Sequence, residues 1–416
     1  MAGHSRAFLW RLMLLLAGLS MFGPFVIDTI FPAFPDLQAQ FVASHAAVQQ
    51  SITAYLVAYA GMSVLHGPLS DALGRRPVIL AGVAVFILAS IGAALSPSLT
   101  WLLVFRVVQG MSAGAGLIVG RALIRDCLDG EEAQRLMAQA AMIFSIAPAL
   151  APIVGGWILG WTSWHGIFWV MALFSSLILI SCHIWLPETH PPEARMKLRF
   201  GRLARSNWSV LRNRRFLLLA MAASFNFGAL FLYIVSAPIV VLDFLHLNQQ
   251  QFGWLFVPIV LGLMVGSFLS SRMAGKVSES HTARIGFGLS AIAMVLNLVY
   301  NLAVDEVQLP WAVLPMSLVA CSVGLILPLL TIAMLDMYPR RRGAAASMQA
   351  LTGLSFNAFL AGIAAPLLAH HRIGLALAAF VSCAVGILLW WRYRVGKRRD
   401  PLRKQTPPLL EDAERL

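Results

Sequence analysis

The sequence predicts an all-α membrane protein with twelve transmembrane helices in two bundles of six. Charged residues make up only 12% of the 416 residues, apolar residues make up 59%, and long apolar runs recur along the chain. A soluble chain would carry roughly a quarter charged residues. A helix that crosses a bilayer needs about 20 mostly apolar residues, which is the length of these runs.

The predicted spans are separated by charges or by turn residues. In the first half they are Leu12–Phe34, Ala46–Leu65, Val78–Leu95, Leu99–Gly120, Leu136–Leu159 and His165–Leu186. In the second half they are Phe216–Leu242, Phe252–Ser271, Ile285–Val304, Trp311–Leu335, Ala344–Leu368 and Gly374–Trp391.

The chain divides nearly symmetrically around a basic segment. We expect an N-terminal bundle over 1–186, a cytoplasmic linker over 187–213, a C-terminal bundle over 214–396 and a cytoplasmic tail over 397–416. Two halves of six spans predict a parallel repeat with a binding site between them at the midplane of the membrane. Because the two halves are fused, a monomer is sufficient.

Basic residues predict the orientation. If both termini are cytoplasmic, all of the 31 Lys and Arg except Arg106 and Arg372 fall in cytoplasmic segments, which is a strong positive-inside pattern. The net charge of +13 therefore indicates the lipid bilayer as partner and does not require nucleic acid. Neither the four cysteines nor the ten histidines have metal-ligand spacing, so no metal site is predicted.

Two charged residues lie inside predicted spans, Asp28 in the first and Arg106 in the fourth. Ionisable side chains in hydrocarbon are costly and usually face a protein interior or a water-filled path. A rise of about 1.5 Å per residue places both in the outer half of the membrane at similar height. We predict that the two charges belong to a transport pathway; the alternatives are a helix-terminal Asp28 and a structural Arg106 bound to carbonyl groups.

Two further segments have ordered small and charged residues. The loop after the second span is expected to turn sharply at the cytoplasmic surface, with glycines allowing close helix approach; its residues are Gly67, Asp71, Gly74, Arg75 and Arg76. The fifth span combines helix-kinking prolines with small residues that permit tight helix contact, at Pro148, Pro152, Gly155 and Gly156.

These motifs resemble those of the major facilitator superfamily. The loop resembles the signature G-x-L-x-D-R-x-G-R-R, with Ala72 in place of the basic residue after the Asp, and Arg106 resembles the buried Arg of the second motif. The fifth span resembles the antiporter motif, with Ala147 and Ala151 where glycine is usual. Asp28, followed by two prolines three residues apart, resembles the Bcr/CflA drug-resistance branch.

The resemblance covers essentially the whole chain. It implies proton-driven export of drugs or related small amphipathic molecules from the bacterial cytoplasm across the inner membrane, with the proton gradient as energy source and no cofactor. It also implies that the loop closes the cytoplasmic side and that Arg106 is linked to proton coupling.

The proposed coupling is a competition at Asp28. Burial favours the protonated form, whereas Arg106 or a bound cation favours the carboxylate, so substrate and proton would displace each other. Aromatic, Met and Asn side chains could line a plastic pocket. The candidates are Met21, Phe25, Tyr55, Tyr59, Phe144, Phe225, Asn226, Phe231, Tyr233 and Asn357; packing or lipid contact is the alternative for each.

Other functions remain open from the sequence. The same fold could export a metabolite such as an amino acid, or import one by symport, and a non-transporting receptor or assembly protein is a further alternative. An enzyme is not predicted, because no nucleophile–base pair, metal-ligand spacing or phosphate-binding loop is present.

Overall fold

The computed structural model is built almost entirely of helices and describes residues 6–127, 130–195, 200–339 and 341–398. The first half contains α1 (Arg6–Asp28), η1 (Phe31–Ala33), α2 (Phe34–Phe41), α3 (His45–Ser63), α4 (His66–Leu73), α5 (Arg75–Ala94), α6 (Leu99–Cys127), α7 (Gly130–Trp161) and α8 (Trp164–Trp185). The linker contains η2 (Pro192–Ala194) and α9 (Phe200–Leu211). The second half contains α10 (Arg214–Val235), η3 (Ile239–Phe244), α11 (Gly253–Met273), α12 (Glu279–Ala303), α13 (Leu314–Asp336), α14 (Arg342–Phe359), η4 (Leu360–Ala364), α15 (Ala365–Leu368) and α16 (Arg372–Arg398).

Most helices have the length and apolarity that a membrane crossing requires. Ten helices in the described part of the chain meet both requirements, and α3 with α4 makes an eleventh as a pair bent by 49°. In α7, residues Ile146–Trp161 form a shorter apolar helix. All predicted spans fall on these helices, so the predicted all-α membrane fold is confirmed.

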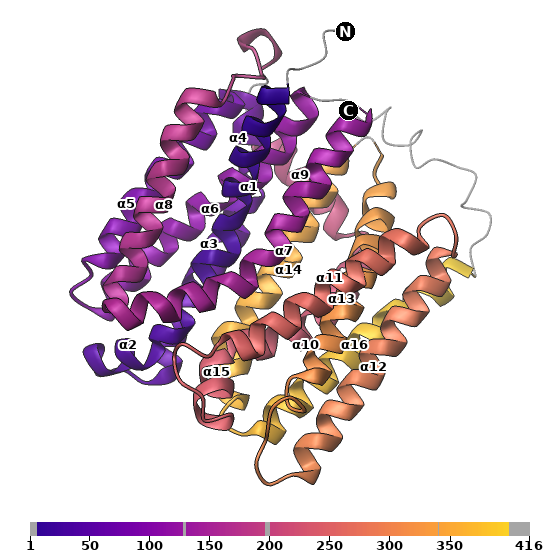
Figure 1. The fold of residues 1–416 in the computed structure, drawn as a ribbon. Coiled ribbons are helices and arrows are strands. Elements are labelled where there is room, and N and C mark those ends of the chain that lie inside the picture. The colour runs from indigo at the N-terminus through magenta and orange to yellow at the C-terminus, as the bar shows by residue number, and fades with distance from the viewer. Residues whose placement is uncertain (1–5, 128–129, 196–199, 340, 399–416) are drawn as a thin grey trace.

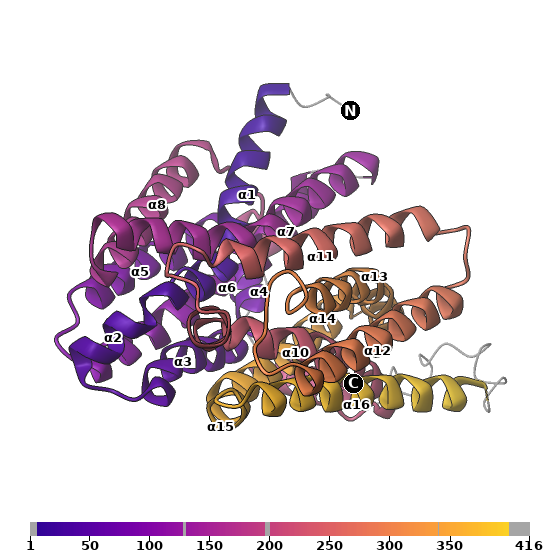
Figure 2. The same ribbon diagram turned by 60° about the horizontal axis from the view of Figure 1, so that its bottom comes forward.

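The two halves repeat one packing scheme. In the first half α1 packs against α7, α3 against α6, and α5 against both α6 and α8. In the second half the helices at the same positions in the order of spans pack alike: α10 against α14, α11 against α13, and α12 against both α13 and α16. Between the halves, α3 contacts α14 and α7 contacts α11, and Figures 1 and 2 both show α7 beside α11.

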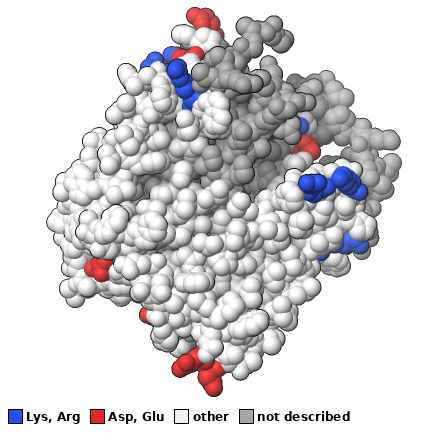
Figure 3. Space-filling view, in the orientation of Figure 1, with Lys and Arg blue, Asp and Glu red and all other residues white. Residues whose placement is uncertain are grey.

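Charges distinguish the two ends of the bundle. We call the end with residues 67–77, 187–195 and 337–342 the basic end, and the end with α2 and residues 369–371 the opposite end (Figure 1). In Figure 3 most charged side chains lie toward these ends, and the lowest ones visible are acidic. The broad surface between them is nearly free of charge, as a lipid-facing surface should be.

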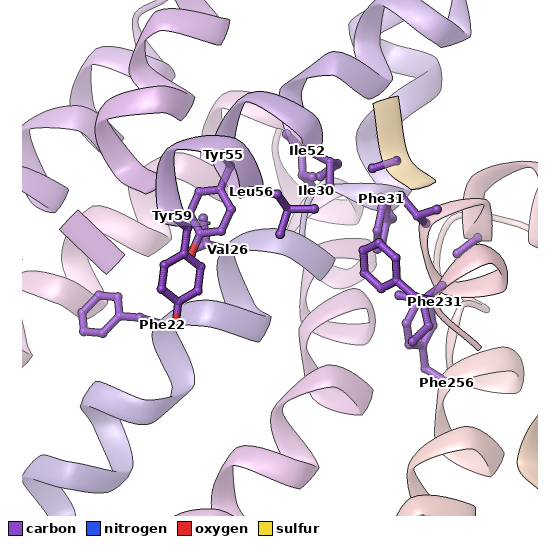
Figure 4. Packing of buried hydrophobic residues seen from close by; sticks show 14 of the residues in the cluster. Phe22, Val26, Ile30, Phe31, Ile52, Tyr55, Leu56, Tyr59, Phe231 and Phe256 are labelled. Carbon is purple, nitrogen blue, oxygen red and sulfur yellow. The ribbon is translucent and has the colours of Figure 1, made fainter. Parts of the chain in front are cut away.

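The halves make specific contacts at the opposite end. The side-chain amide of Gln49 on α3 donates to the carbonyl oxygen of Val235 on α10 at 3.1 Å. The rings of Phe31 and Phe256, from different halves, stack with centroids 6.3 Å apart (Figure 4). Both rings are fully buried, so this end of the interface is closed.

The basic segment predicted as a linker is partly helical. It contains α9, whose Val210 is fully buried in the same cluster as Phe216 and Leu219 of α10, whereas Trp208 on the other face is exposed. The helix is therefore amphipathic, with one apolar side that packs on the second half. Residues 399–416, most of the predicted tail, lie outside the described residues.

Glycines allow the closest helix contacts in both halves. A Cβ at Gly110 of α6 would overlap the carbonyl oxygen of Tyr55 on α3, and one at Gly266 of α11 would overlap the carbonyl oxygen of Cys321 on α13. These are the same pair of helices in the two repeats. Small residues permit such backbone contact inside membranes.

We predict that Gly110→Ala lowers the thermal stability of the purified protein in detergent. The new methyl group must push α6 away from α3, and overpacking typically costs about 1–3 kcal/mol. Gly61→Ala on α3 is the matched control, because no atom lies within 4 Å of its Cβ position. Equal unfolding temperatures for the two variants would contradict the predicted contact.

Candidate transport site and gate

Arg106 is a fully buried cation on α6 that binds two neighbouring helices. Its Nε donates to the carbonyl oxygen of Ser51 on α3, and a terminal nitrogen donates to the carbonyl oxygen of Val26 on α1, both at 3.1 Å. The guanidinium also lies over the Tyr55 ring, 4.9 Å from its centroid. Carbonyl oxygens and a ring face compensate a charge that hydrocarbon would not accommodate.

A chain of hydrogen bonds extends from Arg106 to α5. The terminal nitrogen that binds α1 also donates to Gln109 Oε1 at 3.0 Å, and Gln109 Nε2 donates to Ser90 Oγ at 2.9 Å. The Ser90 hydroxyl donates to the carbonyl oxygen of Phe86 at 2.8 Å. Arg106 thus joins α1, α3, α5 and α6 through buried polar contacts.

Asp28 lies at the last residue of α1 and is 4% exposed. Within the described chain its carboxylate has no hydrogen-bond partner and no ion pair, and Arg106 is farther away than the 4.0 Å of an ion pair. Tyr55 interacts electrostatically with both charges. Asp28 and Arg106 therefore do not form an ion pair with each other, but both interact with the phenol of Tyr55.

Several polar atoms of this cluster have unused hydrogen-bonding capacity. The second terminal nitrogen of Arg106 and the hydroxyl of Tyr55 are buried without a hydrogen-bond partner, and the Asp28 carboxylate adds two free acceptors. Tyr59 lies next to Tyr55, with ring centroids 6.0 Å apart (Figure 4). Buried unsatisfied groups are rare and suggest a strained or functional position, so we define Asp28, Tyr55 and Arg106 as the candidate coupling cluster.

The helix with the antiporter-like motif packs directly behind this cluster. A Cβ at Gly155 of α7 would overlap the carbonyl oxygen of Thr29, the residue after Asp28, and one at Gly156 would overlap the carbonyl oxygen of Gln249 in the second half. Pro148 and Pro152 lie inside α7. The two glycines therefore place α7 against both the end of α1 and the other half of the molecule.

The gate motif (residues 67–77) forms an ion-pair cluster around the buried Arg75 at the basic end. Arg75 is 7% exposed; it pairs with Asp71 at 2.5 Å and with Asp126, at the end of α6, at 2.9 Å. Its terminal nitrogen also donates to Ser70 Oγ at 2.6 Å. Burial raises the pKa of the adjacent Cys127 thiol, and the negative charge of Asp126 raises it further, so the thiol stays neutral.

Other motif residues have different roles. Gly74 has φ +103°, a conformation that glycine adopts readily, and makes the predicted sharp turn between α4 and α5. Gly67 was expected to permit close helix approach, but no atom lies within 4 Å of its Cβ position, so that expectation is wrong for this residue. Arg76 donates to the carbonyl oxygen of His183 on α8 at 2.8 Å.

The start of the linker binds the gate motif, which the sequence did not reveal. Glu188 accepts hydrogen bonds from the backbone N–H of Arg75 at 3.0 Å and of His190 at 2.9 Å, and lies 3.9 Å from the guanidinium of Arg195. The His190 ring contacts the carbonyl oxygen of Asp71 at 3.1 Å. Acidic Glu188 thus caps the first turn of α5, a favourable position for a carboxylate.

The pocket candidates of the first half are only partly brought together. Tyr55 belongs to the coupling cluster and Tyr59 adjoins it, both buried. Phe25 is half-buried and stacks against Phe174 of α8, with centroids 6.2 Å apart. Met21 is half-buried, and the side chain of Phe144 lies outside the described residues.

The candidates of the second half mostly have partners within their own bundle. The Asn226 carbonyl accepts from Ser290 at 2.9 Å, and the Tyr233 hydroxyl accepts from Asn297 at 2.8 Å. These contacts join α10 to α12. The remaining candidates are Phe225, whose ring is 4.4 Å from that of Phe356, buried Phe231, and Asn357, whose carbonyl oxygen is buried without a partner.

Among the described residues no group of three or more His, Cys, Asp or Glu side chains could hold a metal ion. The model of the family described as Major Facilitator Superfamily matches residues 13–366 and 219–413. Two solved structures share the fold: a D-xylose-proton symporter (TM-score 0.71, 16% identity, 94% of this chain and 97% of that one) and the human organic anion transporter MFSD10 (TM-score 0.68, 19% identity, 92% and 99%).

Three curated bacterial proteins are more similar in sequence. The uncharacterized MFS-type transporter YdgK of Bacillus subtilis is 31% identical over 92% of this chain and 96% of its own length. A bicyclomycin resistance protein homolog of Haemophilus influenzae is 31% identical over 68% and 72%, and the multidrug transporter MdfA of Yersinia pestis is 30% identical over 72% of each chain. This chain therefore belongs to the major facilitator superfamily and is a multi-pass membrane carrier, not an enzyme.

Proposed function

We propose that this carrier exports drugs or related small amphipathic molecules across the bacterial inner membrane in exchange for protons. The observation that carries the proposal is the buried Asp28 carboxylate, which has no partner in the described chain and lies near the unused groups of Tyr55 and Arg106. The names of two relatives, a bicyclomycin resistance protein homolog and a multidrug transporter, support this substrate class.

Asp28 is the exchanging group in this mechanism. A carboxylate without a fixed partner can be neutralised either by a proton or by a bound cationic or hydrogen-bonding substrate, but not by both at once. Arg106 is held by two carbonyl groups and by Gln109, so it keeps its position while Asp28 changes charge. One proton that moves inward down 100 mV supplies about 2.3 kcal/mol, and no cofactor is required.

Alternating access follows from the closed opposite end and the cluster at the basic end. We infer that both termini and the gate motif are cytoplasmic, because the basic residues lie there. The gate cluster binds α4, α5, α6 and the linker, and no described hydrogen bond or ion pair joins residues 67–77 to the second half. Contacts between the halves at the opposite end include Gln49 with Val235. The structure thus fits a state with access from the cytoplasm, in a carrier that works as a monomer.

The first experiment measures proton movement in energised everted vesicles with a pH-sensitive dye. Cationic, neutral and zwitterionic drugs are added to vesicles that contain the wild type, Asp28→Asn or Asp36→Asn. We expect drug-induced proton release in the wild type and in Asp36→Asn, whose side chain lies in α2 outside the cluster, and none in Asp28→Asn. Asp28→Asn should unfold at the same or a higher temperature, because it removes a buried unpaired carboxylate.

Two outcomes would contradict this proposal in different ways. Proton release in Asp28→Asn equal to that of the wild type would exclude Asp28 from coupling. If no drug of the panel causes proton release in wild-type vesicles, and the protein is confirmed in the membrane, broad drug export would be excluded and a carrier for one narrow class of metabolite would be favoured.

The linker contact with the gate makes a separate prediction. Glu188→Gln removes the charge that binds Arg75 N–H and Arg195, so trypsin should cut after Arg195 about fivefold faster, equivalent to ~1 kcal/mol of local stability. Glu193→Gln is the control, because Glu193 is exposed and has no partner in the described chain. Equal cleavage rates in the two variants would show that Glu188 does not hold the linker.

A further inference from the structure

A basic cavity lies between α10 and α16, away from the coupling cluster. It has a volume of about 460 Å³ and is lined by Arg214, Arg215, Leu218, Trp391, Arg392 and Tyr393. Guanidinium groups from two different helices thus surround one space. A volume of this size is within the range of small-molecule sites.

Two of the arginines have no described ion-pair or hydrogen-bond partner and are therefore available to a ligand. Arg214 and Arg392 are exposed and make no ion pair or hydrogen bond with any residue of the described chain. Arg215 and Glu279 both interact electrostatically with Tyr393, and no Asp or Glu is among the described residues that line the cavity. The cavity therefore has excess positive charge.

The cavity lies where both helices change from apolar to polar sequence. On α10, Asn213 caps the helix by accepting the N–H groups of Arg215 and Phe216, and the apolar residues follow at once. On α16 the apolar run ends at Trp391, which is 53% exposed. Exposed Trp at the end of an apolar run is typical of the headgroup level of a bilayer.

We propose that this cavity binds the phosphate group of an anionic phospholipid. Arg214 and Arg392 supply charge-assisted, bidentate donors that match phosphate oxygens. Leu218 and Trp391 provide the apolar surface along which the acyl chains leave the headgroup. Basic pockets between transmembrane helices on the cytoplasmic side are suited to such headgroups.

The other repeat provides an internal comparison. The helices at the corresponding positions of the first half are α1 and α8, and there Arg11 lies over the ring of Trp185, 6.0 Å from its centroid. That arginine already has an aromatic partner. The described basic residue on α1 is thus paired with a ring, unlike Arg214 and Arg392 of the second half.

The test measures lipid binding to the purified full-length protein in detergent by native mass spectrometry and by thermal unfolding. The probes are dioleoylphosphatidylglycerol, dioleoylphosphatidylcholine and inorganic phosphate. The wild type and Arg11→Gln should bind phosphatidylglycerol and unfold at a higher temperature with it. The double variant Arg214→Gln/Arg392→Gln should bind it about thirtyfold more weakly, as expected for the loss of two basic contacts to an anionic lipid.

Each remaining outcome overturns the proposal. Equal binding of phosphatidylglycerol by the double variant would exclude the cavity as the site. Equal stabilisation by phosphatidylcholine would show that the site does not require an anionic headgroup. Stabilisation by inorganic phosphate alone would show that the cavity binds a free anion rather than a lipid. None of these measurements involves drug transport, so they do not depend on the proposed function.

Discussion

The buried guanidinium of Arg106 is the constraint on which the first bundle depends. In a bilayer an unsatisfied cation is costly, and here the carbonyl groups of Ser51 and Val26 satisfy it while Gln109 extends the contact to α5. Those carbonyl groups can bind it only if α1, α3, α5 and α6 keep their relative positions. The charge therefore fixes the geometry of four helices, and one of them ends at Asp28. If Asp28 exchanges protons as proposed, it does so at the end of a helix that Arg106 holds in place.

The second bundle repeats the packing without the charge. Its described side-chain contacts between α10 and α12 are neutral: Ser290 donates to Asn226 and Asn297 donates to Tyr233. Neutral hydrogen bonds between helices hold a bundle together without titrating. In the proposed mechanism the two repeats therefore differ in role, since only the first contains the candidate coupling cluster.

Much of this arrangement could be predicted from the sequence because a charged residue inside a membrane span is costly and therefore stands out. Arg106 and Asp28 were visible as charges within apolar runs, and Gly74 as part of a regular series of glycines and charges. The contact of Glu188 with Arg75 was not visible, because it joins segments 113 residues apart. The partners of Asn226 and Tyr233 were hidden for a related reason: a lone Asn or Tyr in a span shows that it is polar, but not which neighbouring helix satisfies it.

The linker is anchored at both of its ends. Near its start, Glu188 and His190 bind the gate motif of the first half, and near its end Asn213 donates to Tyr338 of the second half while Val210 is buried beside α10. If the halves separate during transport as proposed, the distance between these two anchors sets the length of chain available to span the gap. About twenty residues separate His190 from Val210. An extended residue spans at most about 3.6 Å, but the residues of α9 are helical and span less, which shortens the reach of this segment. In the proposed transport cycle, the length of the linker between its two anchors would therefore limit how far the cytoplasmic side can open, and an insertion or deletion within it would change that limit.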